Sequence, residues 1–253
     1  MKLKFLAPAG IGFILLIAVW QMVYTFGDYD AVLFPPPIAV GTAILSLIQD
    51  GTLITHIQVS LYRFLLGYLS AVVIAVGLGL LLGRLPLLWS ILDPIAQVIR
   101  PVSPIAWSPF IVLWFGIGDI PAIVIIFIAA FFPVLLSTVG AVRKVDASYL
   151  KVADNFEVKG VQLLFKVIFP AAFPFIANGL HIAVGTAWIF LVAGEMVGAQ
   201  SGLGYLIVDA RNSMRLDFVL AGIVFIGVLG LLLDKVVGLF ERWINIQWGI
   251  RAT

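Results

Sequence analysis

Long apolar runs make up most of the chain, and short charged or glycine- and proline-rich stretches separate them. A helix needs roughly 20 apolar residues to cross a bilayer. Six runs reach or approach that length, so we predict about six transmembrane helices. The predicted bounds are 5–26, 64–83, 104–118, 120–142, 172–196 and 218–240. The pattern therefore predicts an all-α, polytopic membrane protein with a single transmembrane domain over residues 1–253.

The segments around these runs differ in character. Residues 38–48 have apolar positions at helical spacing and predict a short helix, whereas residues 84–100 predict a short polar connection. Pro104 and Pro109 interrupt the third run, which we expect inside the bundle because freed carbonyls need protein or water partners. No small-residue cleavage site follows the run at 5–26, so we expect it to remain attached as an anchor.

Composition excludes several classes of protein. Hydrophobic residues make up 62% of the chain and charged residues 11%, against about 25% charged in soluble domains. Fifteen basic and 13 acidic side chains are too few to cover a soluble enzyme, and a disordered chain would be far more polar. A net charge of +2 without a basic stripe argues against nucleic-acid binding. The absence of cysteine and the presence of only two histidines disfavour a metal site.

The basic residues predict an orientation. Six crossings put both termini on one side of the membrane. If that side is cytoplasmic, twelve of the 15 Lys and Arg residues lie there, and only Arg63, Arg211 and Arg215 lie outside or at the outer interface. The positive-inside bias therefore predicts cytoplasmic termini and a cytoplasmic loop at about 143–170.

That loop has the pattern of a helical finger. Asp146 is positioned to cap a helix, Lys159-Gly160 offers a turn, and residues 161–169 predict a second short helix stopped at Pro170. The apolar positions at helical spacing in the first helix are Tyr149, Val152, Ala153 and Phe156. Such a finger either packs on its own bundle or docks a soluble partner, and the pattern leaves both alternatives open.

The loop resembles the cytoplasmic loop of permease subunits of binding-protein-dependent ABC importers. In that family the loop begins Glu-Ala-Ala, has Gly four residues after the second Ala, and ends at a Leu-Pro pair. Here Lys151-Val152-Ala153 takes the first place, Glu157 the Gly place and Phe169-Pro170 the Leu-Pro place. The chain departs from the family at Lys151 and Glu157, and Gly160 is an alternative source of the turn.

Flanking stretches narrow the resemblance. Pro-Val-Ser-Pro-Ile-Ala-Trp at 101–107, Leu-Trp-Phe-Gly-Ile-Gly at 113–118 and the glycine-rich stretch at 194–207 are similar to the taurine, alkanesulfonate, nitrate and bicarbonate branch of that family. The likeness extends from about residue 60 to residue 248.

This resemblance implies the fold of a type I importer permease in a bacterial inner membrane. It also implies two cytoplasmic ATPases, a second permease copy, an extracytoplasmic solute-binding protein and a small anionic substrate. ATP and Mg would be bound by the ATPase, because this chain has no G-x-x-x-x-G-K-[ST] phosphate cradle, so we expect neither a cofactor nor an enzyme activity here. The implied ATPase-coupling residues are Tyr149, Lys151, Val152, Ala153, Phe156, Glu157, Lys159, Gly160 and Pro170.

Polar residues within the runs are candidates for the transport pathway, because charge in a membrane is costly. Glu195 lies near the outer end of the fifth run. Its carboxylate belongs to a gate, extends to the outer interface, or accepts hydrogen bonds from backbone amides of the next turn. It would repel an anion, so we assign it no substrate contact. The glycines that follow it permit bending or close approach; they are Gly198, Gly202 and Gly204. His181 with Asn178 either lines a pathway or is a buried, hydrogen-bonded histidine.

Two further pairs have helical spacing. Asp93 and Arg100 share a face that meets either partners or solvent, and Arg211 and Arg215 share a face that meets a docking protein, draws anions or has no special role. The functional alternatives are an ion-coupled secondary transporter and a membrane-embedded enzyme. The first needs a mid-membrane ion site, often in inverted repeats, and the second needs a clustered His/Asp/Glu site. Neither pattern is present in the sequence.

Overall fold

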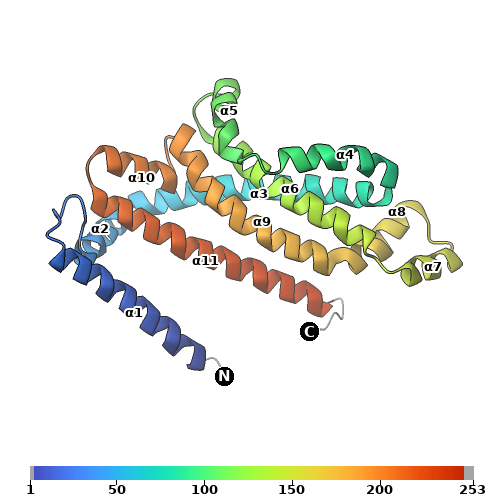
Figure 1. The fold of residues 1–253 in the computed structure, drawn as a ribbon, viewed down its shortest axis with the longest axis horizontal. Helices are drawn as coiled ribbons and strands as arrows, with labels where there is room; N and C mark the ends of the chain where they lie inside the picture. The colour runs from blue at the N-terminus through green and yellow to red at the C-terminus, as the bar shows by residue number, and fades with distance from the viewer. Residues whose placement is uncertain (1–2, 248–253) are drawn as a thin grey trace.

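The structure is a computed structural model that describes residues 3–247, and helices form all of its regular secondary structure over that range (Figure 1). The elements are α1 (Leu3–Phe26), α2 (Pro37–Gln49), α3 (Thr52–Arg84), α4 (Pro86–Ile99), η1 (Pro104–Trp107), α5 (Ser108–Phe115), α6 (Asp119–Arg143), α7 (Ala147–Asn155), α8 (Gly160–Leu163), η2 (Leu164–Ile168), α9 (Phe169–Gly198), α10 (Leu203–Asn212) and α11 (Leu216–Gln247).

Four helices in the described part of the chain are long and apolar enough to cross a membrane: α3, α6, the continuous helix Gly160–Gly198 and Leu216–Ile244. A fifth candidate is the pair formed by α4 and the segment Pro104–Phe115, which is bent by 85°. The first predicted run is helical as α1, and its residues Gly10–Phe26 form a shorter apolar helix. The all-α, multi-helix membrane architecture predicted from the sequence is confirmed.

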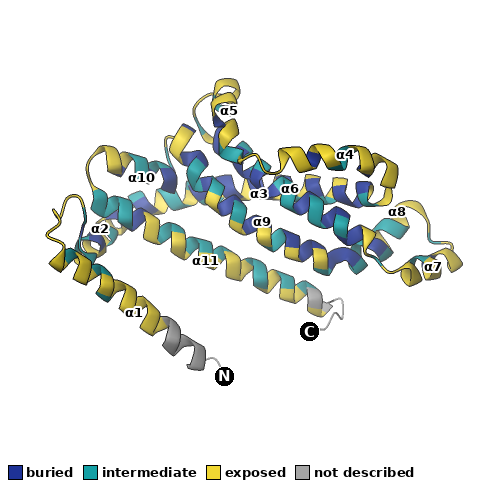
Figure 2. Cartoon of the chain, in the orientation of Figure 1, coloured by how far each residue is buried: buried dark blue, intermediate teal, exposed yellow. Residues whose placement is uncertain are grey.

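The centre of the molecule is formed by α3, α6 and α9, which carry most of the buried residues (Figure 2). Along α3 every fourth residue on one face is small; these residues are Gly67, Ala71, Ala75, Gly79 and Gly83. A Cβ atom on Gly79 would lie 2.6 Å from the Thr138 Cβ, and one on Gly83 would lie 2.6 Å from the Val142 Cβ. The missing side chains therefore let α3 and α6 approach closely, as small residues do in membrane helix pairs.

Residues 84–100 are not the polar connection that we predicted, because residues Pro86–Ile99 form α4. Trp89 and Ala96 are buried, and α4 packs against α3. Pro86 suits the first turn of a helix, where its missing N–H removes no hydrogen bond. Pro101 cannot donate to the carbonyl of Gln97, and α4 ends there.

The predicted stop at Pro170 is also wrong. The helix runs without interruption from Gly160 to Gly198 through a π-helical turn at Leu164–Ile168. Pro170 lies in the first turn of α9, directly after this wider turn. A π turn changes the hydrogen-bond register, so the missing N–H of a proline is accommodated without a break.

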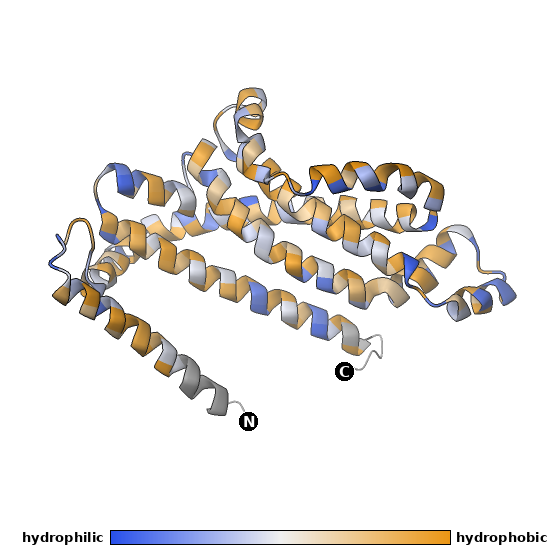
Figure 3. Ribbon diagram, viewed as in Figure 1, coloured by the Kyte–Doolittle hydropathy of each residue, from blue (hydrophilic) through white to orange (hydrophobic). Residues whose placement is uncertain are grey.

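The helices are arranged so that α7 marks one end of the molecule, while α2, α5 and α10 lie away from it (Figure 1). Figure 3 shows that the long helices are largely apolar and that hydrophilic residues gather on α7, on α10 and on the last turns of α11. Arg84, at the end of α3, lines the same hollow as Lys151 of α7. The chain therefore brings the ends of α3 and α6 and the start of the Gly160–Gly198 helix together beside α7.

The close approach of α3 and α6 predicts a position-specific cost for added side-chain volume. Gly79→Ala should destabilise the protein by about 1–3 kcal/mol, because the new methyl group overlaps Thr138. Gly77→Ala on the same helix has nothing within 4 Å and should leave the melting temperature unchanged or raise it. Thermal unfolding of the purified proteins in detergent compares the two, and equal melting temperatures would contradict the packing.

Candidate functional site

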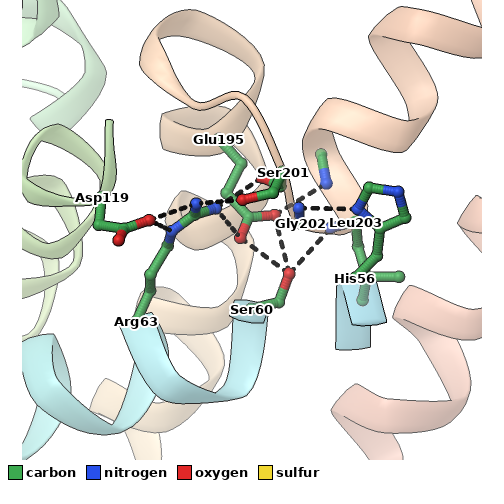
Figure 4. Close-up of polar contacts among 9 residues, drawn as sticks. His56, Ser60, Arg63, Asp119, Glu195, Ser201, Gly202 and Leu203 are labelled. Atoms are coloured by element: carbon green, nitrogen blue, oxygen red, sulfur yellow. Dashed lines mark hydrogen bonds and ion pairs between the residues drawn. The ribbon is translucent and has the colours of Figure 1, made fainter. Parts of the chain in front are cut away.

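A buried arginine organises the end of the bundle that lies away from α7. Arg63 is on α3 and is only 1% exposed. Its Nε donates to Asp119 Oδ1 at the start of α6 at 2.8 Å, and its Nη1 donates to Glu195 Oε1 on α9 at 2.9 Å (Figure 4). It also donates to the hydroxyl of Ser201 at 2.8 Å and to the Ser201 carbonyl at 2.6 Å. One guanidinium thus joins α3, α6, α9 and the segment after α9.

Glu195 is equally buried, at 1% exposure, and each of its oxygens has donors. The Ser60 hydroxyl donates to both carboxylate oxygens, with Oγ 2.8 Å from Oε1 and 3.0 Å from Oε2. The Gly204 amide donates to Oε2 at 2.8 Å. Ser60 Oγ in turn accepts from the Leu203 amide at 2.8 Å. A buried ion pair is tolerable only when its remaining polar atoms are hydrogen-bonded, and this pair meets that condition.

The segment between α9 and α10 wraps around the Glu195 carboxylate. Gly202 has φ +100°, and a Cβ atom there would lie 2.2 Å from Glu195 Oε1. A Cβ atom on Gly204 would lie 2.7 Å from the Glu195 Cβ. The Gly202 amide donates to His56 Nδ1 at 2.9 Å, which fixes the segment against α3 (Figure 4). The close approach that we expected at these glycines is present, and only glycine fits both positions.

Glu195 therefore binds a backbone amide of the following turn, as one of our alternatives stated, whereas the alternative in which it extends to the outer interface is wrong. Arg63, which we predicted outside or at the outer interface, is a buried side chain, and its side of the membrane stays a prediction. The predicted run began at residue 64, but α3 begins at Thr52. The signal that could have found the network is the spacing of His56, Ser60 and Arg63, which puts all three on one face of a longer helix.

Gly198 lies at the rim of the network. Its carbonyl accepts from the Gly118 amide at 2.9 Å, and a Cβ atom on it would lie 3.2 Å from a Val112 methyl group. Gly198 therefore supports the contact between the end of α9 and the segment before α6.

His181 lies apart from this network and pairs with acids on α11. Its side chain is 35% exposed; Nε2 lies 2.8 Å from Asp234 Oδ1 and Nδ1 lies 3.3 Å from Glu241 Oε2. The buried-histidine alternative is therefore wrong. Asn178 is exposed on α9, and no hydrogen bond joins it to this cluster in the described structure. The cluster links α9 to α11.

Arg211 and Arg215 do not share a helical face. The helix α10 ends at Asn212, and Met214 takes φ +56° before α11 begins. Arg215 instead binds Asp217 at 2.8 Å, with its guanidinium 3.9 Å from the centre of the Phe218 ring.

The finger formed by α7 has well-defined ends. Asp146 Oδ1 accepts from the Ser148 amide at 2.7 Å, as predicted for the helix cap, and this hydrogen bond holds the pKa of the Asp146 carboxyl below its usual range. At the other end the Val158 amide donates to the Ala153 carbonyl at 2.9 Å, and Glu157 has φ +55°. This is the helix ending in which glycine is preferred. Glu157, which stands at the family's Gly place, adopts the backbone that a glycine would adopt.

The apolar face of α7 is open. Phe156 is 77% exposed, Tyr149 58% and Val152 54%, whereas Ala153 is buried. These side chains border a groove of about 870 Å³ between α7 and the start of α9; its other apolar walls are Val158, Val167, Pro170, Ala171 and Pro174. On the other side of α7, Arg84, Lys151 and Lys159 line a second hollow, which Gly160 borders with φ +60°. The implied coupling residues thus surround one helix, which has an aromatic side and a charged side that Asp154 also lines.

Comparison with known proteins gives a family match. Residues 71–246 match the family described as "Binding-protein-dependent transport system inner membrane component". A permease named for aliphatic sulfonates transport, SsuC of Bacillus subtilis, is 38% identical over 233 residues, which cover 92% of this chain and 84% of that protein. The nitrate import permease protein NrtB of Leptolyngbya laminosa is 36% identical over 240 residues, which cover 91% of this chain and 85% of that protein. The resemblance stated from the sequence is confirmed.

A solved structure shares the fold. A chain from a structure described as "Inward facing conformations of the MetNI methionine ABC transporter: CY5 native crystal form" superposes with a TM-score of 0.69 at 19% identity. The match covers 78% of this chain and 97% of that chain. The expected permease-like fold is therefore confirmed, and the family match makes the chain a multi-pass transport component and not an enzyme.

The network predicts that substituting the two acids that bind Arg63 lowers the stability of the protein by different amounts. Glu195→Ala should destabilise the protein by about 3–5 kcal/mol, because it leaves buried donors without an acceptor. Asp119→Ala should cost about 1 kcal/mol or less, because the Asp119 side chain is 54% exposed and Glu195 still holds the arginine. Thermal unfolding in detergent measures both changes in stability. Equal losses of stability would show that Glu195 is not the main partner that compensates the buried charge of Arg63.

The backbone of Glu157 predicts a stabilising substitution. Glu157→Gly should stabilise the end of α7 by about 1 kcal/mol, because it removes the cost of the left-handed conformation. Lys151→Gly, within α7 itself, should destabilise the helix by roughly 0.5–1 kcal/mol. Hydrogen exchange of the α7 amides reads out both changes, and faster exchange in Glu157→Gly would contradict the assigned backbone.

Proposed function

This chain belongs to the binding-protein-dependent transport system inner membrane component family, and we propose that it is the translocation subunit of an ATP-driven importer of a small anion. A sulfonate such as taurine, nitrate and bicarbonate are the substrates that fit this proposal. The names of the relatives support it, since one is named for aliphatic sulfonates and one for nitrate. The chain itself supplies no phosphate cradle, so the ATP is hydrolysed by a separate subunit.

The observation that carries the proposal is the exposed apolar face of α7. Phe156, Tyr149 and Val152 are exposed and border an apolar groove between α7 and the start of α9. Exposed aromatic side chains beside a charged rim have the composition of a protein–protein contact, in which aromatic residues often dominate the binding energy. Lys151 and Lys159 supply that rim. The ATPase is the partner that this surface docks.

The position of the finger suits it to transmit force. Only three residues separate the end of α6 from α7, and the helix that follows the finger continues unbroken into α9. A displacement of α7 by an ATPase therefore moves the near ends of two core helices. Such movement at one end, with the far ends held by the Arg63 network, alternates access to the two sides of the membrane.

The complete transporter then contains two copies of this chain, two ATPases and an extracytoplasmic solute-binding protein. The α7 finger and both termini face the cytoplasm in this arrangement. The basic residues around the finger support that orientation, because positive charge favours the cytoplasmic side.

Phe156→Asp tests the docking role. A charge in the centre of the apolar face should weaken ATPase association by at least about 30-fold, because buried aromatic anchors contribute about 2 kcal/mol or more. The measurement is the amount of tagged ATPase that co-purifies with the chain from membranes in mild detergent.

The matched control is Asn155→Asp, which adds the same charge at the adjacent exposed position outside the apolar face. It should keep the ATPase bound. Normal association of Phe156→Asp, in a protein that inserts at the usual level, would overturn the docking role.

A further inference from the structure

The most unusual exposed charge in the molecule is Arg100, at the break between α4 and η1. Together, α4 and the segment Pro104–Phe115 are apolar enough to form one membrane span, but they are bent by 85° relative to each other. Pro101 lies in the break and Pro104 directly follows it, and neither has an N–H to donate. α4 has 14 residues and is about 21 Å long, so a start at the edge of an apolar layer about 30 Å thick places Arg100 well inside that layer. This depth differs from the cytoplasmic place that the positive-inside count gives to Arg100.

Arg100 has no carboxylate partner among the residues that the structure describes. Arg63, by contrast, binds the carboxylates of Asp119 and Glu195. The nearest acid on α4, Asp93, binds Gln97 at 3.3 Å and lies two turns, about 10 Å along the axis, from Arg100. The positive charge of Arg100 is therefore free to meet a mobile anion.

The polar residues of α4 form one stripe. Asp93, Gln97 and Arg100 are spaced by four and three residues and share a face, whereas Val98 lies about 200° around the helix from Arg100. Hydrophilic positions interrupt the apolar surface of α4 in Figure 3. Trp89 and Ala96, which pack toward the bundle, lie on the same side as the stripe, because Asp93 follows Trp89 by four residues and Arg100 follows Ala96 by four. The stripe therefore lies on the bundle side of α4, opposite Val98, yet Arg100 at its end is exposed.

A polar stripe with a free cation cannot stay against lipid, because charged side chains at that depth face protein or a water-filled cavity. Non-helical backbone at that depth is likewise tolerated only where protein covers it or where it lines a water-filled cavity. We infer that the break at residues 100–103 and the stripe above it line the aqueous passage of the transported anion, and that the Arg100 guanidinium is the cationic group that contacts it. This inference rests on the proposed function and adds the residue that recognises the negative charge.

Thiol labelling tests whether the stripe faces water. The chain has no cysteine, so Arg100→Cys and Val98→Cys each introduce its single thiol. The probe is 2-sulfonatoethyl methanethiosulfonate, a small membrane-impermeant sulfonate, applied to membranes that contain the complete transporter. Arg100→Cys should react at least tenfold faster than Val98→Cys, which is 74% exposed on the opposite side of α4. Equal rates, or an unreactive Arg100→Cys, would overturn the inference.

Uptake of labelled nitrate and taurine tests whether the charge at this position matters. Arg100→Gln should lower uptake at least tenfold and Arg100→Lys should retain most of it, both with unchanged amounts of chain and ATPase. After modification of Arg100→Cys, a trimethylammonium methanethiosulfonate should restore uptake and the sulfonate reagent should not. Normal uptake by Arg100→Gln would overturn the contact with the anion.

The remaining outcomes separate this inference from the proposed function. Loss of the second copy from the purified Arg100→Gln complex would make Arg100 an interface residue and would overturn the inference, while the importer role would stand. If the unaltered chain binds its ATPase but transports neither probe, the proposed substrate class fails, and the labelling rates still decide whether the stripe faces water.

Discussion

The compensation of one buried guanidinium fixes the arrangement of the central helices. Placing Arg63 in an apolar bundle is costly, and Glu195 and Asp119 offset that cost from two other helices. The arginine therefore specifies how α3, α6 and α9 meet at this end. The row of small residues on α3 begins one turn later, at Gly67, so the polar contact continues directly into the close packing of α3 on α6. The segment around Gly202 is folded onto the same carboxylate.

The two ends of the bundle differ in a way that suits a mechanical role. The Arg63 end is held by charge-assisted hydrogen bonds among four segments of the chain. At the α7 end, by contrast, the described structure shows an exposed aromatic face and two hollows. This difference supports the proposed mechanism, in which an ATPase displaces α7 while the Arg63 network holds the other end. Two arginines differ in the same way, since Arg63 binds two carboxylates, whereas Arg100 has no carboxylate partner among the described residues.

Local patterns predicted the long apolar helices, the cap at Asp146, the apolar face of α7 and the family likeness. The predicted bounds were wrong where a charged residue lies within a helix and does not mark the end of a span. Arg63 and the 84–100 stretch were both read as boundaries because they are polar, yet Arg63 is paired with an acid 132 residues away and residues 86–99 place their polar side chains on one face. A long-range ion pair leaves no local periodicity. The predicted helix end at Pro170 was wrong for a different reason, because a π turn has no distinct sequence signal.

The most direct test of the account is the composition of the complex that this chain forms. The chain, tagged and extracted from its native membrane in mild detergent, should purify with an ATPase in equal copy number, as counted by native mass spectrometry. That result follows from a chain that couples to an ATPase through α7 and binds no ATP itself. A chain that purifies alone, under conditions in which a control importer of the same family stays intact, would contradict the account and make α7 an ordinary surface helix.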